Sequence, residues 1–131
     1  MSISYSIAER NNRLTQILNV IDGGAGAGIL TIYNGVRPAT GGAATTALAT
    51  FTLPKPSGTI ASGVYTFNAI TAVIIGTTGT ATWARLTDSA GTFAADVNVG
   101  TSGSDINFNS TAFSAGAQAS ITSMTITEGN P

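Results

Sequence analysis

The sequence predicts a mainly β domain, an antiparallel β-sandwich or jelly roll, with one helix at its N-terminus. One segment has apolar residues at helical spacing, and eight later segments have the short, β-branched or alternating pattern of strands. No second helical segment separates the strands, which excludes a repeated β–α–β architecture. The length of 131 residues fits a single domain. We expect a helix and Gly-rich linker over 1–28 and the sandwich over 29–131.

The helix is expected over residues 7–22. Ser6 is a favourable N-cap residue, and Glu9 follows three positions later, which is the spacing of a capping box. The apolar residues within the range fall near one stripe, and Gly23 ends the pattern. We expect this helix, or a Gly-rich loop, to serve as the docking element, because it would be attached to the sandwich rather than buried in it.

The strands are expected where β-branched and aromatic residues lie between breaks marked by Gly, Pro or Ser. Their ranges are 29–33, 47–53, 64–67, 69–75, 81–87, 93–99, 105–108 and 119–127. Residues 37–46 and 54–58 are rich in small residues or proline and are expected as surface loops, the first of them flexible. A run of turns and short strands of this kind is typical of all-β sandwiches.

The composition indicates a protein that is not an enzyme. The chain has no Cys and no His, and its five basic and six acidic residues are scattered. Proton transfer and metal binding usually depend on histidine, thiolates or clustered acids. We therefore expect no catalytic, cofactor or metal site. The dispersed basic residues predict no nucleic-acid partner, and the longest apolar run, 72–75, predicts no membrane span.

Two sets of acidic and amide side chains are the strongest candidates for chemistry. Asp105, Asn107 and Asn109 would share one face of a strand and present oxygen atoms to a cation such as calcium, but one carboxylate makes a poor cage. A solvated strand face is the preferred interpretation. Asp88, Asp96 and Asp105 could supply the paired carboxylates of a glycoside hydrolase. Asp88, however, precedes Ser-Ala-Gly and fits an aspartate that opens a turn.

The remaining candidates also have structural interpretations. A Ser–Lys dyad would need Lys55, which stands between two prolines in an expected loop. The Gly-rich run 23–28 resembles a phosphate-binding turn, but it follows a helix and precedes a strand, the reverse of the dinucleotide motif. Four aromatic residues could form a platform for sugars: Tyr5, Tyr33, Tyr65 and Trp83. Trp83 and Arg85 would share one strand face, so packing in the core or a cation–π pair is the alternative.

Six stretches of the chain can be compared with a known group of proteins: Arg10–Leu14, Ile21–Gly28, Ile32–Gly42, Thr78–Arg85, Asp88–Gly91 and Val99–Asp105. Together they resemble a group of small proteins associated with the virions of tailed bacteriophages. The Arg-Pro-Ala-Thr-Gly-Gly segment at 37–42 is the most recognisable of them. The resemblance covers most of the chain and implies a virion setting, with synthesis in the host cytoplasm. It transfers no catalytic residue.

The sequence and the resemblance together predict a capsid decoration or cement protein. Its partners would be the major capsid protein or other virion proteins, and copies of the chain would form a homo-oligomer. A tail, neck or head-fibre component is the alternative, followed by a carbohydrate-binding module. Arginine and tyrosine are frequent hot spots of interfaces. On that ground the expected partner contacts are Arg10, Arg13, Tyr33 and Arg37.

Overall fold

A computed structural model of the chain describes residues 4–39 and 41–128. Helix α1 spans Ile7–Asp22, and the predicted mainly β class with one N-terminal helix is confirmed. The strands that follow are β1 (Ile29–Tyr33), β2 (Ala47–Thr52), β3 (Gly58–Ala61), β4 (Val64–Phe67), β5 (Val73–Ile74), β6 (Gly79–Thr80), β7 (Trp83–Thr87), β8 (Phe93–Gly100), β9 (Ile106–Phe108), β10 (Ala112–Phe113), β11 (Gln118–Ala119) and β12 (Ile121–Thr127). No helix within the described ranges has the length and apolarity needed to cross a membrane.

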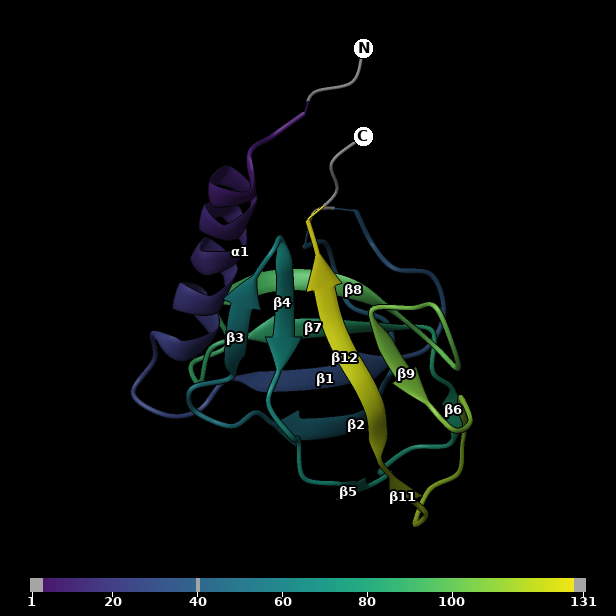
Figure 1. Ribbon diagram of the computed structural model, residues 1–131. Helices are drawn as coiled ribbons and strands as arrows, with labels where there is room; N and C mark the ends of the chain where they lie inside the picture. Colours follow the sequence, from purple (N-terminus) through teal and green to yellow (C-terminus); the bar gives the residue numbers. More distant parts are fainter. Residues whose placement is uncertain (1–3, 40, 129–131) are drawn as a thin grey trace.

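Eight strands form one large sheet in the order β2-β1-β7-β8-β9-β12-β4-β3. The sheet is curled: β8, β7, β1 and β2 run across the view in Figure 1, while β3, β4 and β12 cross steeply in front of them. Neighbouring strands are antiparallel except β8 and β9, which pair in parallel, so the sheet is mixed rather than wholly antiparallel. Two small sheets, β10–β6 and β11–β5, complete the fold.

The core lies between the two halves of the curled sheet and includes the helix. Alternate residues of the strands point inward, among them Leu30 on β1 and Leu86 on β7. Leu14 and Ile21 of α1 are fully buried in the same apolar cluster, and the helix contacts β3, β4, β7 and β8. Full burial of one such side chain contributes roughly 1.5–3 kcal/mol. The helix is therefore attached to the sheet through one face, which contributes Leu14 and Ile21 to the core, while its other residues stay partly or fully exposed.

Local signals determine where α1 begins and ends. The Ser6 side chain accepts a hydrogen bond of 3.1 Å from the backbone N–H of Glu9, and Gly23 is the C-cap. Gly28 then allows the linker to pass close to the helix, because a Cβ atom there would lie 2.5 Å from Cγ2 of Ile21. The predicted bounds of the helix and its stop at Gly23 are confirmed.

A buried polar contact joins the end of α1 to β3 and β4. The backbone N–H of Ser57 donates to Oδ2 of Asp22 at 3.1 Å, and the Ser57 hydroxyl is hydrogen bonded to the Tyr65 hydroxyl. Burial raises the pKa of Tyr65 to about 12, because removal from water disfavours the phenolate. These bonds satisfy hydroxyl groups that would otherwise be costly to bury.

Candidate functional site

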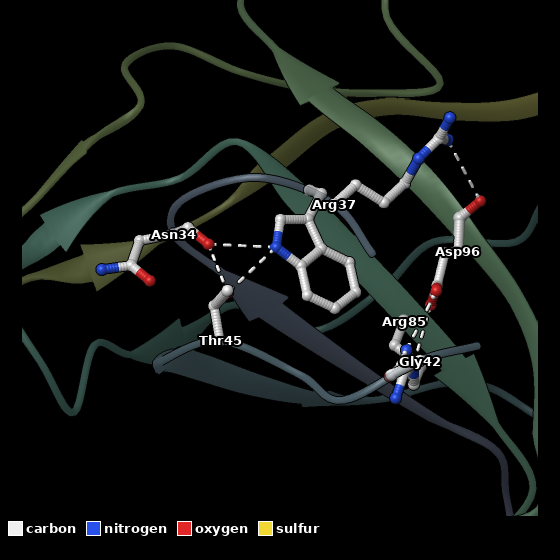
Figure 2. A network of polar contacts seen from close by, with 7 residues as sticks. Asn34, Arg37, Gly42, Thr45, Arg85 and Asp96 are labelled. Atoms are coloured by element: carbon white, nitrogen blue, oxygen red, sulfur yellow. Dashed lines mark hydrogen bonds and ion pairs between the residues drawn. The ribbon is translucent and has the colours of Figure 1, made fainter. Parts of the chain in front are cut away.

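A loop at 34–46, described except for residue 40, is hydrogen bonded to side chains on the outer face of β7 and lies beside β1 and β8 (Figure 2). Side chains alternate along β7, so Trp83 and Arg85 point away from the core while Ala84 and Leu86 enter it. Trp83 is in register with Tyr33 on β1, and Arg85 with Asp96 on β8. The loop covers these side chains.

Trp83 fastens the first and last parts of the loop. Its Nε1–H donates to the Asn34 carbonyl at 3.0 Å and to the Thr45 hydroxyl at 3.1 Å. The ring stacks on Tyr33, with centroids 4.4 Å apart and planes inclined by 16°. Trp83 is only 1% exposed although it stands on the outer face. Its apolar ring is thus buried by the loop, and its single donor is satisfied.

Arg85 and Asp96 form a bidentate ion pair under the middle of the loop. The Nε–Oδ1 distance is 2.8 Å and the Nη2–Oδ2 distance is 3.0 Å, while Nη2 also donates to the Gly42 carbonyl at 2.8 Å. The guanidinium lies 5.3 Å from the Trp83 ring and 5.2 Å from the Phe93 ring. Hydrogen bonding to Asp96 raises the pKa of Arg85. Both side chains are ionised, and their opposite charges cancel. The pair also holds the loop backbone through the bond from Nη2 to the Gly42 carbonyl.

The two ends of the loop are bonded to each other as well as to the sheet. Thr46 N–H donates to Oδ1 of Asn34 at 3.1 Å, and the Thr45 hydroxyl donates to the Asn34 carbonyl. Thr82 on the sheet side donates to the Gly35 carbonyl at 2.6 Å. The loop is at the surface as expected, and these bonds attach residues 34, 35, 42, 45 and 46 to the sheet and to one another. The flexibility expected for 37–46 stays a prediction.

A groove of about 340 Å³ lies beside the fastened loop. It is lined by Arg37, Pro38, Ala39, Gly41, Phe93 and Asp96. Phe93 is 42% exposed and supplies an apolar wall. The Arg37 guanidinium is exposed, and its contact with the Asp96 carbonyl is long, at 3.5 Å. Since Arg85 neutralises the Asp96 carboxylate, the groove is weakly positive.

The four predicted partner contacts fall into two places. Tyr33 and Arg37 belong to the loop site described above. Arg10 and Arg13 lie on α1 and contact the end of β12: Nε and Nη2 of Arg10 donate to the Glu128 carbonyl at 3.1 and 2.8 Å, and Nη1 of Arg13 lies 2.9 Å from Oε1 of Glu128. Both helix arginines therefore have partners inside the chain. Their contact with another protein stays a prediction.

The oxygen-bearing side chains near Asp105 bond to their own chain. Oδ2 of Asp105 accepts from the Asn98 N–H at 3.0 Å, and Oδ1 of Asn107 accepts from the Ser104 N–H at 3.2 Å. Asn109 lies beyond the end of β9 and is exposed. No group of three His, Cys, Asp or Glu residues among those described could hold a metal ion. The preferred structural interpretation of this segment agrees with these contacts.

The three aspartates considered for hydrolysis are each engaged separately. Asp96 is paired with Arg85, and Asp105 with the Asn98 backbone. Oδ1 of Asp88 accepts from the backbone N–H groups of Ala90 and Thr92 at 2.9 and 2.8 Å, which confirms the predicted turn. The hydrogen bond from Thr92 is the main cause that lowers the pKa of Asp88.

The Gly-rich run and the single lysine also have structural contacts. Gly26 N–H donates to the Ser89 hydroxyl at 3.1 Å, and Nζ of Lys55 donates to the Gly24 carbonyl at 2.8 Å. The run therefore links α1 to β1 and packs on the β7–β8 turn. The interpretation as a helix stop and linker agrees with this placement.

The aromatic platform for sugars is wrong, because the loop covers Trp83 and the core contains Tyr65, which is 0% exposed. The predicted alternative, a cation–π contact between Trp83 and Arg85, is confirmed. Sequence reasoning did not identify Phe93, Gly42 or Thr45 as members of this site. The only sequence signal for this site was that Trp83 and Arg85 would share one strand face. Contacts between a loop and the sheet leave no local pattern in the sequence.

The chain has no match among family models, curated proteins or solved structures in the three comparisons made.

Proposed function

We propose that this chain is a structural protein of a bacteriophage virion that decorates the capsid and cements its subunits. The structural role is supported by the bonds that the charged side chains make within the chain. Four basic and five acidic side chains each bond to backbone or to one another within the chain: Arg10, Arg13, Lys55, Arg85, Asp22, Asp88, Asp96, Asp105 and Glu128. They brace loops and chain ends.

Such bracing suits a protein whose task is to keep its shape while it bridges larger subunits. Each bond limits the conformational freedom of the loop that it holds, so less entropy is lost when the surface binds a partner. A lattice offers many identical positions, and modest contacts gain strength through avidity if several copies act together. The phage setting rests on the resemblance of stretches such as 37–42. The predicted partner is the major capsid protein.

The test measures how many copies of the protein bind to each capsid particle. Purified protein is mixed with genome-filled and with expanded empty capsids that lack it, the particles are pelleted, and the copies bound per particle are measured. We expect saturation at a multiple of the lattice repeat. Binding of a few copies would contradict decoration and favour the alternative of a neck, tail or fibre component. Absence of binding to heads and to tails would overturn a virion role.

A further inference from the structure

A pocket of about 240 Å³ lies within the connection between β9 and β12, and it shares no residue with the groove beside the 34–46 loop. The apolar part of its lining consists of side chains that are almost fully buried: Ile75, Phe108, Phe113 and Ala119. The rings of Phe108 and Phe113 meet edge to face, with centroids 5.2 Å apart and planes inclined by 87°. Sites for small molecules are typically concave, with apolar walls and a few polar groups that orient the ligand.

The two arms of this connection are held by separate strands, so the fold itself forms the pocket. β10 on one arm pairs with β6, and β11 on the other arm pairs with β5. Between them, the Ala115 N–H donates to the Thr78 hydroxyl at 2.9 Å, and the Ile75 N–H donates to the Ala117 carbonyl at 2.8 Å. In Figure 1, β5 and β11 lie at the opposite end of the molecule from the first turn of α1. A ligand would meet a pocket that needs little further ordering, which favours binding.

The polar part of the lining offers hydrogen-bonding groups but no charge. Five exposed lining residues carry hydroxyl or amide side chains: Asn109, Ser110, Ser114, Gln118 and Ser120. The Ser110 hydroxyl accepts from the Ala112 N–H at 3.2 Å, whereas the side chains of the other four form no hydrogen bond with any residue that the structure describes. None of the described residues in the lining is acidic or basic. An ion that entered the pocket would lose water without gaining a partner of opposite charge.

We propose that this pocket binds one neutral sugar residue. The C–H groups of a pyranose ring would lie on the apolar part of the lining, and its hydroxyl groups would meet Asn109 and Gln118, whose side-chain amides both donate and accept. The volume of about 240 Å³ is at the small end for ligand pockets and suits one ring rather than a long oligosaccharide. The lining selects this class of ligand, since a charged ligand lacks a counter-charge and a wholly apolar one leaves the amides unused. The inference does not depend on capsid decoration.

Saturation-transfer NMR and calorimetry test the pocket with the methyl glycosides of glucose, galactose and mannose. Each glycoside is compared with the free sugar and with the corresponding uronic acid, which places a carboxylate on the same ring. We expect the wild type to bind at least one neutral glycoside and to bind its uronic acid about tenfold more weakly or worse, because the lining holds no cation. Both results support the pocket if the glycoside binds: equal binding of the free sugar shows that the ring suffices, and weaker binding identifies the end of a glycan as the ligand.

Substitutions of the two amide side chains locate the binding. N109A and Q118A each remove a group that would donate to and accept from the sugar, and each should weaken binding about fivefold. N12A and Q16A are the matched controls, because they make the same chemical changes at exposed positions of α1 and should bind like the wild type.

A bulky side chain at the pocket gives a second, steric test. S114W should abolish binding, whereas S102W places the same ring at an exposed serine of the β8–β9 connection and should bind like the wild type. Thermal melts establish that each variant is folded. The proposal is overturned if the wild type binds none of the neutral glycosides, or if the uronic acids bind as tightly. It is also overturned if folded N109A, Q118A and S114W bind like the wild type.

Discussion

Trp83 shows how one side chain determines the conformation of a loop. Its indole N–H bonds to both ends of the 34–46 loop, and its ring is stacked on Tyr33. The residue stands on the outer face of the sheet, outside the apolar core cluster. Here the 34–46 loop covers the ring and shields it from solvent. The burial of Trp83 is therefore a consequence of loop closure and not of the core.

Replacing Trp83 by Phe should loosen the loop while keeping an aromatic ring against Tyr33. The variant loses the Nε1–H donor, and we expect the free energy of unfolding to fall by about 1–2 kcal/mol. Denaturant unfolding measures this change, and amide exchange at Thr46, whose N–H bonds to Asn34, should become faster. Y33F keeps the stacked ring and is the control. Equal stability of W83F and Y33F would contradict the role of the indole N–H.

Asp88 should contribute stability that depends on pH. Backbone N–H groups lower its pKa in the folded state, so the stabilisation is present above the unfolded pKa of about 3.9 and is lost as pH falls through the folded value. Denaturant unfolding should show that the free energy of unfolding of the wild type exceeds that of D88N by a constant amount near neutral pH. This difference should shrink below about pH 4. If the difference in free energy of unfolding stays constant below about pH 4, the charge of Asp88 does not contribute to stability.

At the scale of elements, α1 acts as a clamp on the β3–β4 hairpin. The turn of that hairpin has positive φ at Ser62 (52°) and Gly63 (74°), as expected for two-residue hairpin turns. Asn11 of the helix accepts from the Gly63 N–H at 2.8 Å, and the Arg10 guanidinium lies against Gly63. The polar Arg-Asn-Asn-Arg run of the helix therefore has a structural use.

Asn11 and Asn12 make a matched pair for testing this clamp. N11A removes the acceptor of the Gly63 N–H and should lower the free energy of unfolding by about 1 kcal/mol. Asn12 is exposed, and N12A makes the same chemical change without loss of that bond. Denaturant unfolding of both variants, with amide exchange at Gly63, gives the comparison. Similar effects of N11A and N12A would contradict the clamp.

The elements also show what a sequence can predict. The bounds of α1 follow from Ser6 and Gly23, which act within a few residues of where they stand. The sequence predicts a loop over 54–58 and no strand at Gly58–Ala61, whereas the structure has β3 there, because its strand character comes from pairing with β4. The expected strand at 69–75 is reduced to Val73–Ile74. The two-residue strands depend on partners distant in the sequence, which no local periodicity records. The parallel β8–β9 pair joins residues only seven positions apart, such as Val99 and Ile106, and depends on the path of the short connection between them.

At the scale of the whole molecule, helix and sheet should unfold as one unit. Leu14 is fully buried in the same cluster as residues of both halves of the sheet. L14A should therefore lower the free energy of unfolding by about 3 kcal/mol. Helical circular dichroism and Trp83 fluorescence should report the same midpoint. Q16A, an exposed change in the same helix, is the control. Loss of the helix signal before the fluorescence change would indicate two separate units.

Arg13 lies 4.4 Å from the centroid of the Tyr5 ring and 2.9 Å from Oε1 of Glu128. One side chain thus touches both ends of the described chain. Any polypeptide joined before residue 4 and after residue 128 would enter and leave the domain at nearly the same point. This is the geometry that allows a domain to be inserted into a surface loop of another protein, or its ends to be joined and reopened elsewhere as a circular permutant.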